Sequence, residues 1–119
     1  MSESIIKKKS FDFAVRVVNL YKLINTERKE HVMSKQLLRS GTSIGANVRE
    51  AVNGQSSADF IHKLSIAQKE CDESIYWLEL LKETKYINEK EFISMNENAV
   101  ELLKIIRSII ITSKKTHNL

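Results

Sequence analysis

Seven small or apolar residues recur at alternating steps of four and three in the third quarter of the sequence. They are Phe60, Leu64, Ala67, Cys71, Ser74, Leu78 and Leu81. At about 3.6 residues per turn, this spacing places all seven along one side of an α-helix, as a seam for neighbouring helices. The seam predicts a helix over residues 57–84, roughly 40 Å long at about 1.5 Å per residue.

Three further segments show helical periodicity, and the sequence holds nothing that would interrupt them often. The 119 residues include no proline and three glycines, and proline is the residue that most strongly breaks helices. We expect helices over residues 10–28, 34–52, 57–84 and 88–114. Long amphipathic helices with short joints pack antiparallel, so the pattern predicts one all-α domain over residues 1–119. Its architecture is an antiparallel up-down-up-down four-helix bundle.

Polar residues mark where these helices are expected to begin and end. Ser10 is the candidate N-cap of the first helix, and Asn88 with Glu91 three residues later has the spacing of a capping box. Asn53-Gly54 is a candidate left-handed stop after the second helix.

Two glycines lie one turn apart inside the apolar arc of the second helix. Gly41 and Gly45 each cost a helix about 1 kcal/mol relative to alanine. Their position on the apolar side favours a role in letting a neighbouring backbone come close. The alternative is that both are tolerated surface residues.

The last helix carries more isoleucine than the core of a monomeric bundle needs. Its isoleucines extend past an apolar stripe of about 100°, and the first helix is apolar over a similarly wide arc. We infer a second buried surface, most simply a contact in a homo-oligomer. The alternative is a large core with scattered exposed isoleucines. The candidate interface residues are Ile105, Ile109, Ile110 and Ile111.

The net charge of +4 is concentrated in the first half of the chain, where residues 1–50 hold ten Lys/Arg against five Asp/Glu. Lys35, Arg39 and Arg49 fall within an arc of about 80° on the second helix. Such an arc can contact RNA or DNA phosphates in a salt-dependent way, or it can be an ordinary solvated helix face. Exposed aromatic residues for base stacking are not interleaved with it.

We find no pattern that indicates catalysis, a metal site, a cofactor or a small-molecule substrate. The single cysteine, Cys71, lies on the apolar seam and excludes an internal disulfide. Asp59 and His62 form only one loose ligand pair, whereas a di-iron bundle needs carboxylates from all four helices. The longest apolar run is far short of the about 20 residues that cross a bilayer, and no signal peptide is evident. We therefore expect a cytoplasmic protein.

Three segments resemble a known family. They are QLLRSGTSIGANVREA at 36–51, DFIHKLSIAQKE at 59–70 and ESIYWLELL at 73–81. Their pattern Arg39-x-x-x-Ser43-Ile44-x-x-Asn47 is similar to the bacterial four helix bundle proteins, also called the 23S rRNA-intervening-sequence protein family. The resemblance covers about residues 8–112, nearly the whole chain.

The resemblance implies a non-enzymatic cytoplasmic bundle that assembles as a ring-shaped homopentamer. A related branch comprises the accessory proteins of diversity-generating retroelements, whose basic pentamers bind reverse transcriptase and nucleic acid. Because this chain is only mildly basic, we do not assign it to that branch. Our hypothesis is a self-assembling interaction scaffold, and the alternative is an RNA- or DNA-binding accessory protein.

Overall fold

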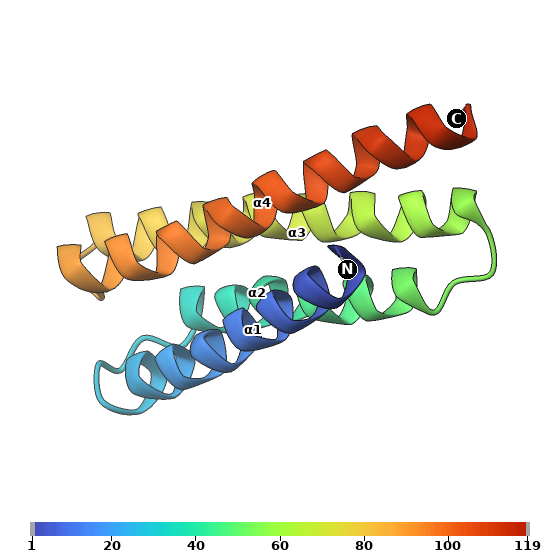
Figure 1. Ribbon diagram of the computed structural model, residues 1–119. Coiled ribbons are helices and arrows are strands. Elements are labelled where there is room, and N and C mark those ends of the chain that lie inside the picture. The colour runs from blue at the N-terminus through green and yellow to red at the C-terminus, as the bar shows by residue number, and fades with distance from the viewer. Residues whose placement is uncertain (1, 119) are drawn as a thin grey trace.

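Four antiparallel helices make up most of the computed structural model, which describes residues 2–118. They are α1 (Ser2–Thr26), α2 (Met33–Val52), α3 (Ser57–Glu83) and α4 (Glu89–His117). The bundle is a rod of 48 × 21 × 21 Å, in which each helix runs back along the one before it (Figure 1). This arrangement confirms the predicted all-α four-helix bundle.

The first helix begins at Ser2, so the prediction of a start at Ser10 is wrong. Ser10 is buried in the middle of α1 and its hydroxyl donates to the carbonyl of Lys7. Ile6, also buried, extends the core seam by a full turn toward the N-terminus. Three consecutive lysines follow Ile6 and gave this segment the composition of a polar tail, although the seam continues through it. The buried seam of α1 consists of Ile6, Ser10, Phe13, Val17, Leu20 and Ile24.

A buried carboxylate, rather than a serine at the cap position, holds the start of α2. The helix begins at Met33, and Val32 in the cap position makes no side-chain hydrogen bond. Instead, Glu30 accepts hydrogen bonds from the backbone N–H groups of Val32, Met33 and Ser34 at 2.9, 2.9 and 2.7 Å. These are donors that a helix N-terminus leaves without an intrahelical partner. A negative charge there also interacts favourably with the helix dipole.

The predicted left-handed stop at Asn53-Gly54 is also wrong, because Asn53 has φ −91° and no described glycine has a positive φ. Gly54 is instead a position of close approach. A Cβ atom there would clash with a carboxylate oxygen of Asp59.

A left-handed backbone conformation occurs instead at a lysine just after the end of α3. Lys85 has φ 67°. The N–H of Tyr86 donates to Leu81 at 2.9 Å and that of Lys85 to Lys82 at 3.0 Å. These two bonds define a Schellman motif, whose left-handed position usually holds glycine.

We therefore expect Lys85→Gly to raise the free energy of unfolding by about 0.5–1 kcal/mol, since glycine has no Cβ to strain this conformation. Urea denaturation followed by circular dichroism measures the change. Lys69→Gly is the matched control, because Lys69 is exposed within α3 and should lose about 1 kcal/mol. A loss at both positions would show that the left-handed lysine is not strained.

The fourth helix begins as predicted and ends later. Asn88 accepts from the N–H of Glu91 while the Glu91 carboxylate accepts from the N–H of Asn88, which confirms the capping box. The helix continues to His117 rather than 114, and Asn118 closes it with φ 55°. The terminal turns carry lysine and histidine, which interact favourably with a helix C-terminus.

The predicted close approach of a neighbouring backbone is confirmed at Gly45, whereas Gly41 makes room for a side chain, and both glycines face α1. A Cβ atom at Gly41 would lie 2.8 Å from two methyl carbons of Val17, and one at Gly45 would lie 3.3 Å from the carbonyl oxygen of Ser10. The other side of α2 meets α3 through a buried serine pair, in which the Ser74 hydroxyl lies 2.9 Å from that of Ser40. Small residues therefore bring three helices close together.

The first and last helices have the least extensive contact of any neighbouring pair, and polar groups join them. Arg16 of α1 donates to the carbonyl and hydroxyl of Ser94 at 3.3 and 2.6 Å, and to the side-chain oxygen of Asn98. Lys9 reaches Glu101 at 3.3 Å. Hydrogen bonds and an ion pair therefore make up a large part of the contact between α1 and α4.

Candidate functional site

The predicted basic arc lies on the exposed side of α2, but its central residue is paired with acids. Arg39 forms ion pairs with Glu70, at 3.3 Å, and with Glu73, both on α3. The guanidinium of Arg49 lies 5.8 Å from the centre of the Phe11 ring, within cation–π range. Lys35 is exposed near the start of α2. The three residues share one side of α2, but only Lys35 extends without a partner among the described residues.

Glu73 is the centre of a small hydrogen-bonded cluster between α2 and α3. The indole N–H of Trp77 donates to it at 2.9 Å, and Arg39 donates from the opposite helix. The bonds from Trp77 and Arg39 lower the pKa of Glu73, and the bond with Glu73 raises the pKa of Arg39. Both groups are therefore charged over the whole neutral range. The cluster stabilises the helix pair and leaves little positive potential at Arg39 for a phosphate.

The motif from Arg39 to Asn47 also forms contacts within the fold. Ser43 donates to the carbonyl of Arg39 at 2.6 Å, and the amide of Asn47 donates to the carbonyl of Ser43 at 2.8 Å. Ile44 is fully buried. These contacts account for the residue types of the motif through packing and local hydrogen bonding.

The four candidate interface isoleucines are not equivalent in the structure. Ile110 belongs to the core of the chain itself, while Ile105 and Ile109 are half-buried and pack against that core. Only Ile111 is largely exposed, at 56%. The surplus of isoleucine in α4 therefore fills the bundle to a greater extent than we expected from the sequence.

Exposed apolar surface is instead concentrated on α1. Phe11 and Val15 are 53% and 44% exposed, lie one turn apart, and have half-buried Val18 next along the same side. Large apolar residues exposed singly are ordinary, but a contiguous strip indicates a contact surface. We call Phe11, Val15 and Val18 the α1 strip.

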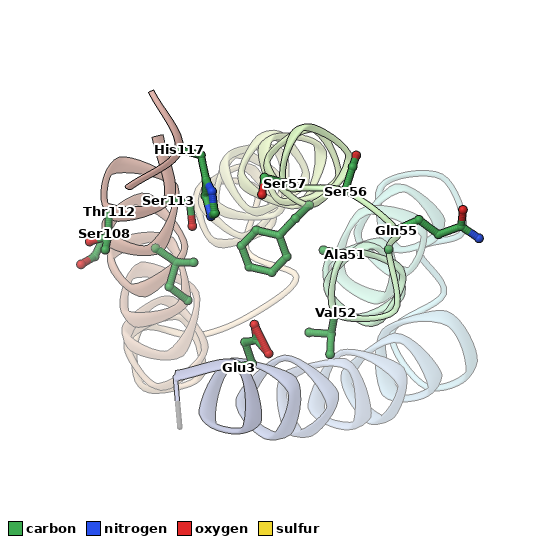
Figure 2. A pocket seen from close by; sticks show the side chains of 13 residues that line it. Glu3, Ala51, Val52, Gln55, Ser56, Ser57, Ser108, Thr112, Ser113 and His117 are labelled. Atoms are coloured by element: carbon green, nitrogen blue, oxygen red, sulfur yellow. The ribbon is translucent and has the colours of Figure 1, made fainter. Parts of the chain in front are cut away.

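The end of the bundle that holds the N-terminus of α1 and the C-terminus of α4 is hollowed. The hollow has a volume of about 580 Å³ and combines Phe60 with several hydroxyl groups. Figure 2 shows Glu3 and Val52 on one side of this space and Ser113 and His117 on the other. Among the described residues that line it, Glu3 and His117 are the ionisable groups.

The residues with chemical reactivity have ordinary structural surroundings. Burial raises the pKa of the Cys71 thiol to about 12, and its Sγ donates to the carbonyl of Ala99 at 3.1 Å. A thiol in this state is a poor nucleophile at neutral pH. Within residues 2–118, no three His, Cys, Asp or Glu side chains come together as a metal site. None of the described helices is both long and apolar enough to cross a membrane.

A family model described as "23S rRNA-intervening sequence protein" matches residues 2–108. The chain belongs to this family. A crystal structure of a protein of unknown function, from the S23 ribosomal protein family of Bacteroides thetaiotaomicron VPI-5482, has 57% sequence identity to it. The two superpose with a TM-score of 0.91 over 92% of this chain and 98% of that chain. No curated protein matches the sequence. The 23S rRNA-intervening sequence protein family thus accounts for the bundle, while α4 continues to His117, beyond the matched residues.

Proposed function

We propose that the protein is a non-enzymatic bundle that assembles with copies of itself and, in assembled form, acts as an interaction scaffold. The observation that carries this proposal is the α1 strip, where Phe11 and Val15 leave about half of their surfaces in water. Burial of apolar surface contributes about 25 cal/mol per Å². A second copy is the proposed occupant, and the ring-shaped homopentamer implied by the family resemblance is the proposed assembly.

A ring requires that one surface of each copy meets a different surface of the next, because only such a contact repeats around a closed circle. The α1 strip supplies one surface. Tyr76, 56% exposed on α3, and half-buried Trp77 and Leu80 next to it form a second apolar area on another helix. Aromatic residues with a polar end are common at such contacts. We propose these two areas as the complementary surfaces.

The double substitution Phe11→Glu with Val15→Lys tests the assembly. It places two charges in the proposed contact, and their spacing forms a favourable Glu–Lys pair one turn apart, so the helix itself should be preserved. We expect light scattering after size exclusion to give a multiple of 13.7 kDa for the natural chain and the monomer mass for the variant.

Ile93→Glu with Glu97→Lys is the matched control on α4, where Ile93 is 47% exposed. It should leave the mass of the assembly unchanged. A natural chain that elutes at 13.7 kDa over the whole accessible concentration range would refute self-assembly. An unchanged mass in the α1 variant would refute the α1 strip as its site.

The alternative function is that of a nucleic-acid-binding accessory protein, like those of diversity-generating retroelements. The ion pairs of Arg39 count against the arc of Lys35, Arg39 and Arg49 as its binding surface. A different group of cations, on α4, supports binding to nucleic acid.

A further inference from the structure

The C-terminal half of α4 exposes four cations that have no counter-ion among the described residues. They are Lys104, Arg107, Lys114 and Lys115, here called the α4 cations. None of them lies within 4 Å of a carboxylate in the part of the chain that the structure describes, whereas Arg28, Arg39 and Lys63 all do. Glu101 is the last acidic residue of the sequence. The end of α4 is therefore purely basic.

Helical geometry places the four α4 cations along one side of α4. At 3.6 residues per turn they fall within an arc of about 100°, and they extend over about 16 Å of the helix axis. The exposed hydroxyls of Ser108 and Thr112 border this arc. Asp72 on α3 lies near this arc, since both Asp72 and Arg107 influence Cys71. Glu97 and Glu101 of α4 line one hollow together with Lys104. Beyond Glu101, however, the surface of α4 carries Arg107, Lys114 and Lys115 and no acid of its own, so this part of it is positive.

We propose that the α4 cations bind the sugar–phosphate backbone of a nucleic acid. Duplex DNA carries one negative charge for each about 1.7 Å of its axis, so a positive surface about 16 Å long faces several phosphates at once. Hydroxyl side chains such as Ser108 and Thr112 also donate to phosphate oxygens. The expected recognition is independent of base sequence, because a side of one helix with lysines, an arginine and hydroxyls offers no stacking platform.

Positive charge alone is not enough for a helix to bind an anionic membrane. Helices that lie on membranes insert a broad apolar side below the lipid headgroups, and the apolar side of α4 is buried in the bundle. Among the α4 cations the exposed apolar residue is Ile111 alone. The surface therefore fits a rigid polyanion better than it fits a bilayer.

This inference does not depend on self-assembly. The α1 strip lies on a different helix, so a monomer would bind through the same four cations. Assembly would repeat the surface in every copy and raise the avidity for a long polyanion.

Fluorescence anisotropy with labelled RNA and DNA duplexes of one sequence tests the proposal. With four phosphates neutralised per copy, log K should fall against log salt with a slope of about −3 to −4. Affinity should then drop about a hundredfold between about 50 and about 200 mM salt. The variant with Lys104, Arg107, Lys114 and Lys115 all changed to Gln should lose at least tenfold at low salt and most of the slope.

Two matched variants separate the location of charge from its amount. Changing Lys7, Lys22, Lys35 and Lys90 to Gln removes the same charge from exposed sites elsewhere, and binding should stay within about threefold. Changing Lys104, Lys114 and Lys115 to Arg should preserve affinity. Equal loss in both Gln variants, or no binding at about 50 mM salt, would overturn the proposal. Preferential binding to phosphatidylserine vesicles over both duplexes would also overturn it, in favour of a membrane surface.

Discussion

Glu30→Gln is expected to lower the free energy of unfolding by about 2–3 kcal/mol. The Glu30 carboxylate accepts three backbone N–H groups at the start of α2. Glutamine has nearly the same shape, but its amide nitrogen would face a donor, and its oxygen would lack the negative charge. Thermal unfolding should show a fall in midpoint of about 10 °C.

The pH dependence of this effect follows from the ionisation of Glu30. Burial raises its pKa, but the hydrogen bonds from Met33, Ser34 and Val32 outweigh burial, and the net result is a lowered pKa. The carboxylate therefore stabilises the fold above the pKa of the unfolded chain, which is about 4.3 for glutamate. That contribution is lost as the pH falls through the lower pKa of the folded state.

The difference in stability between the natural chain and Glu30→Gln should accordingly be constant at neutral pH and shrink below about pH 4. Glu27→Gln is the control, because Glu27 is exposed three residues earlier. Its effect should stay within about 0.5 kcal/mol. A difference that persists unchanged into acid would show that the charge of Glu30 contributes nothing.

Gly41→Ala is expected to destabilise the bundle by about 1–2 kcal/mol, although alanine is the better helix former. The new Cβ would lie 2.8 Å from two methyl carbons of Val17. Valine in a helix has one strongly preferred rotamer and is hard to displace. Val17→Ala alone should cost about 1–3 kcal/mol through the cavity that it leaves.

The double variant with Gly41→Ala and Val17→Ala should lose at least about 1 kcal/mol less stability than the sum of the two single variants. Removal of the Val17 methyl groups relieves the clash, and the Cβ added at position 41 fills part of the cavity. Urea denaturation of the four proteins in this cycle measures the coupling. Val48→Ala in place of Val17→Ala is the control, since Val48 is buried two turns from Gly41 and its effect should add to that of Gly41→Ala. Strict additivity in the Val17 cycle would rule out close approach as the role of Gly41.

Local sequence patterns predicted the parts of the fold that depend on neighbours along the chain. The seam of α3 and the Asn88–Glu91 capping box are both determined within a few residues. Both are confirmed, except that Ile61 is buried at the first turn of the seam where Phe60 was expected. The start of α1 was missed because three lysines conceal a seam that Ile6 continues. The role of Glu30 was missed because it caps α2 from the loop between α1 and α2, outside the usual cap position. The spacing Glu30-x-x-x-Ser34, just before an apolar periodic segment, was the available signal.

The candidate surfaces were harder to predict because they depend on residues that are distant in sequence. Arg39 is an unfavourable phosphate ligand because it is paired with Glu70 and Glu73 of α3. These two acids lie 31 and 34 residues further along the sequence. Ile110, a candidate interface residue, is instead a core residue, because it lies on the side of α4 that packs inside the bundle. By contrast, the absence of acidic residues after Glu101 was visible in the sequence, and helical geometry was enough to place the four α4 cations on one side.

The polar closure between α1 and α4 has a consequence for the order in which the bundle folds. All extensive helix contacts join helices that follow one another in the chain, so each requires only a short loop to close. The contact from Arg16 to Ser94 instead spans 78 residues. Chains dominated by local contacts fold fast, and their most distant contacts are the most costly in entropy. The seam between α1 and α4 should therefore form last and separate first, with α2 and α3 remaining as the most persistent part of the bundle.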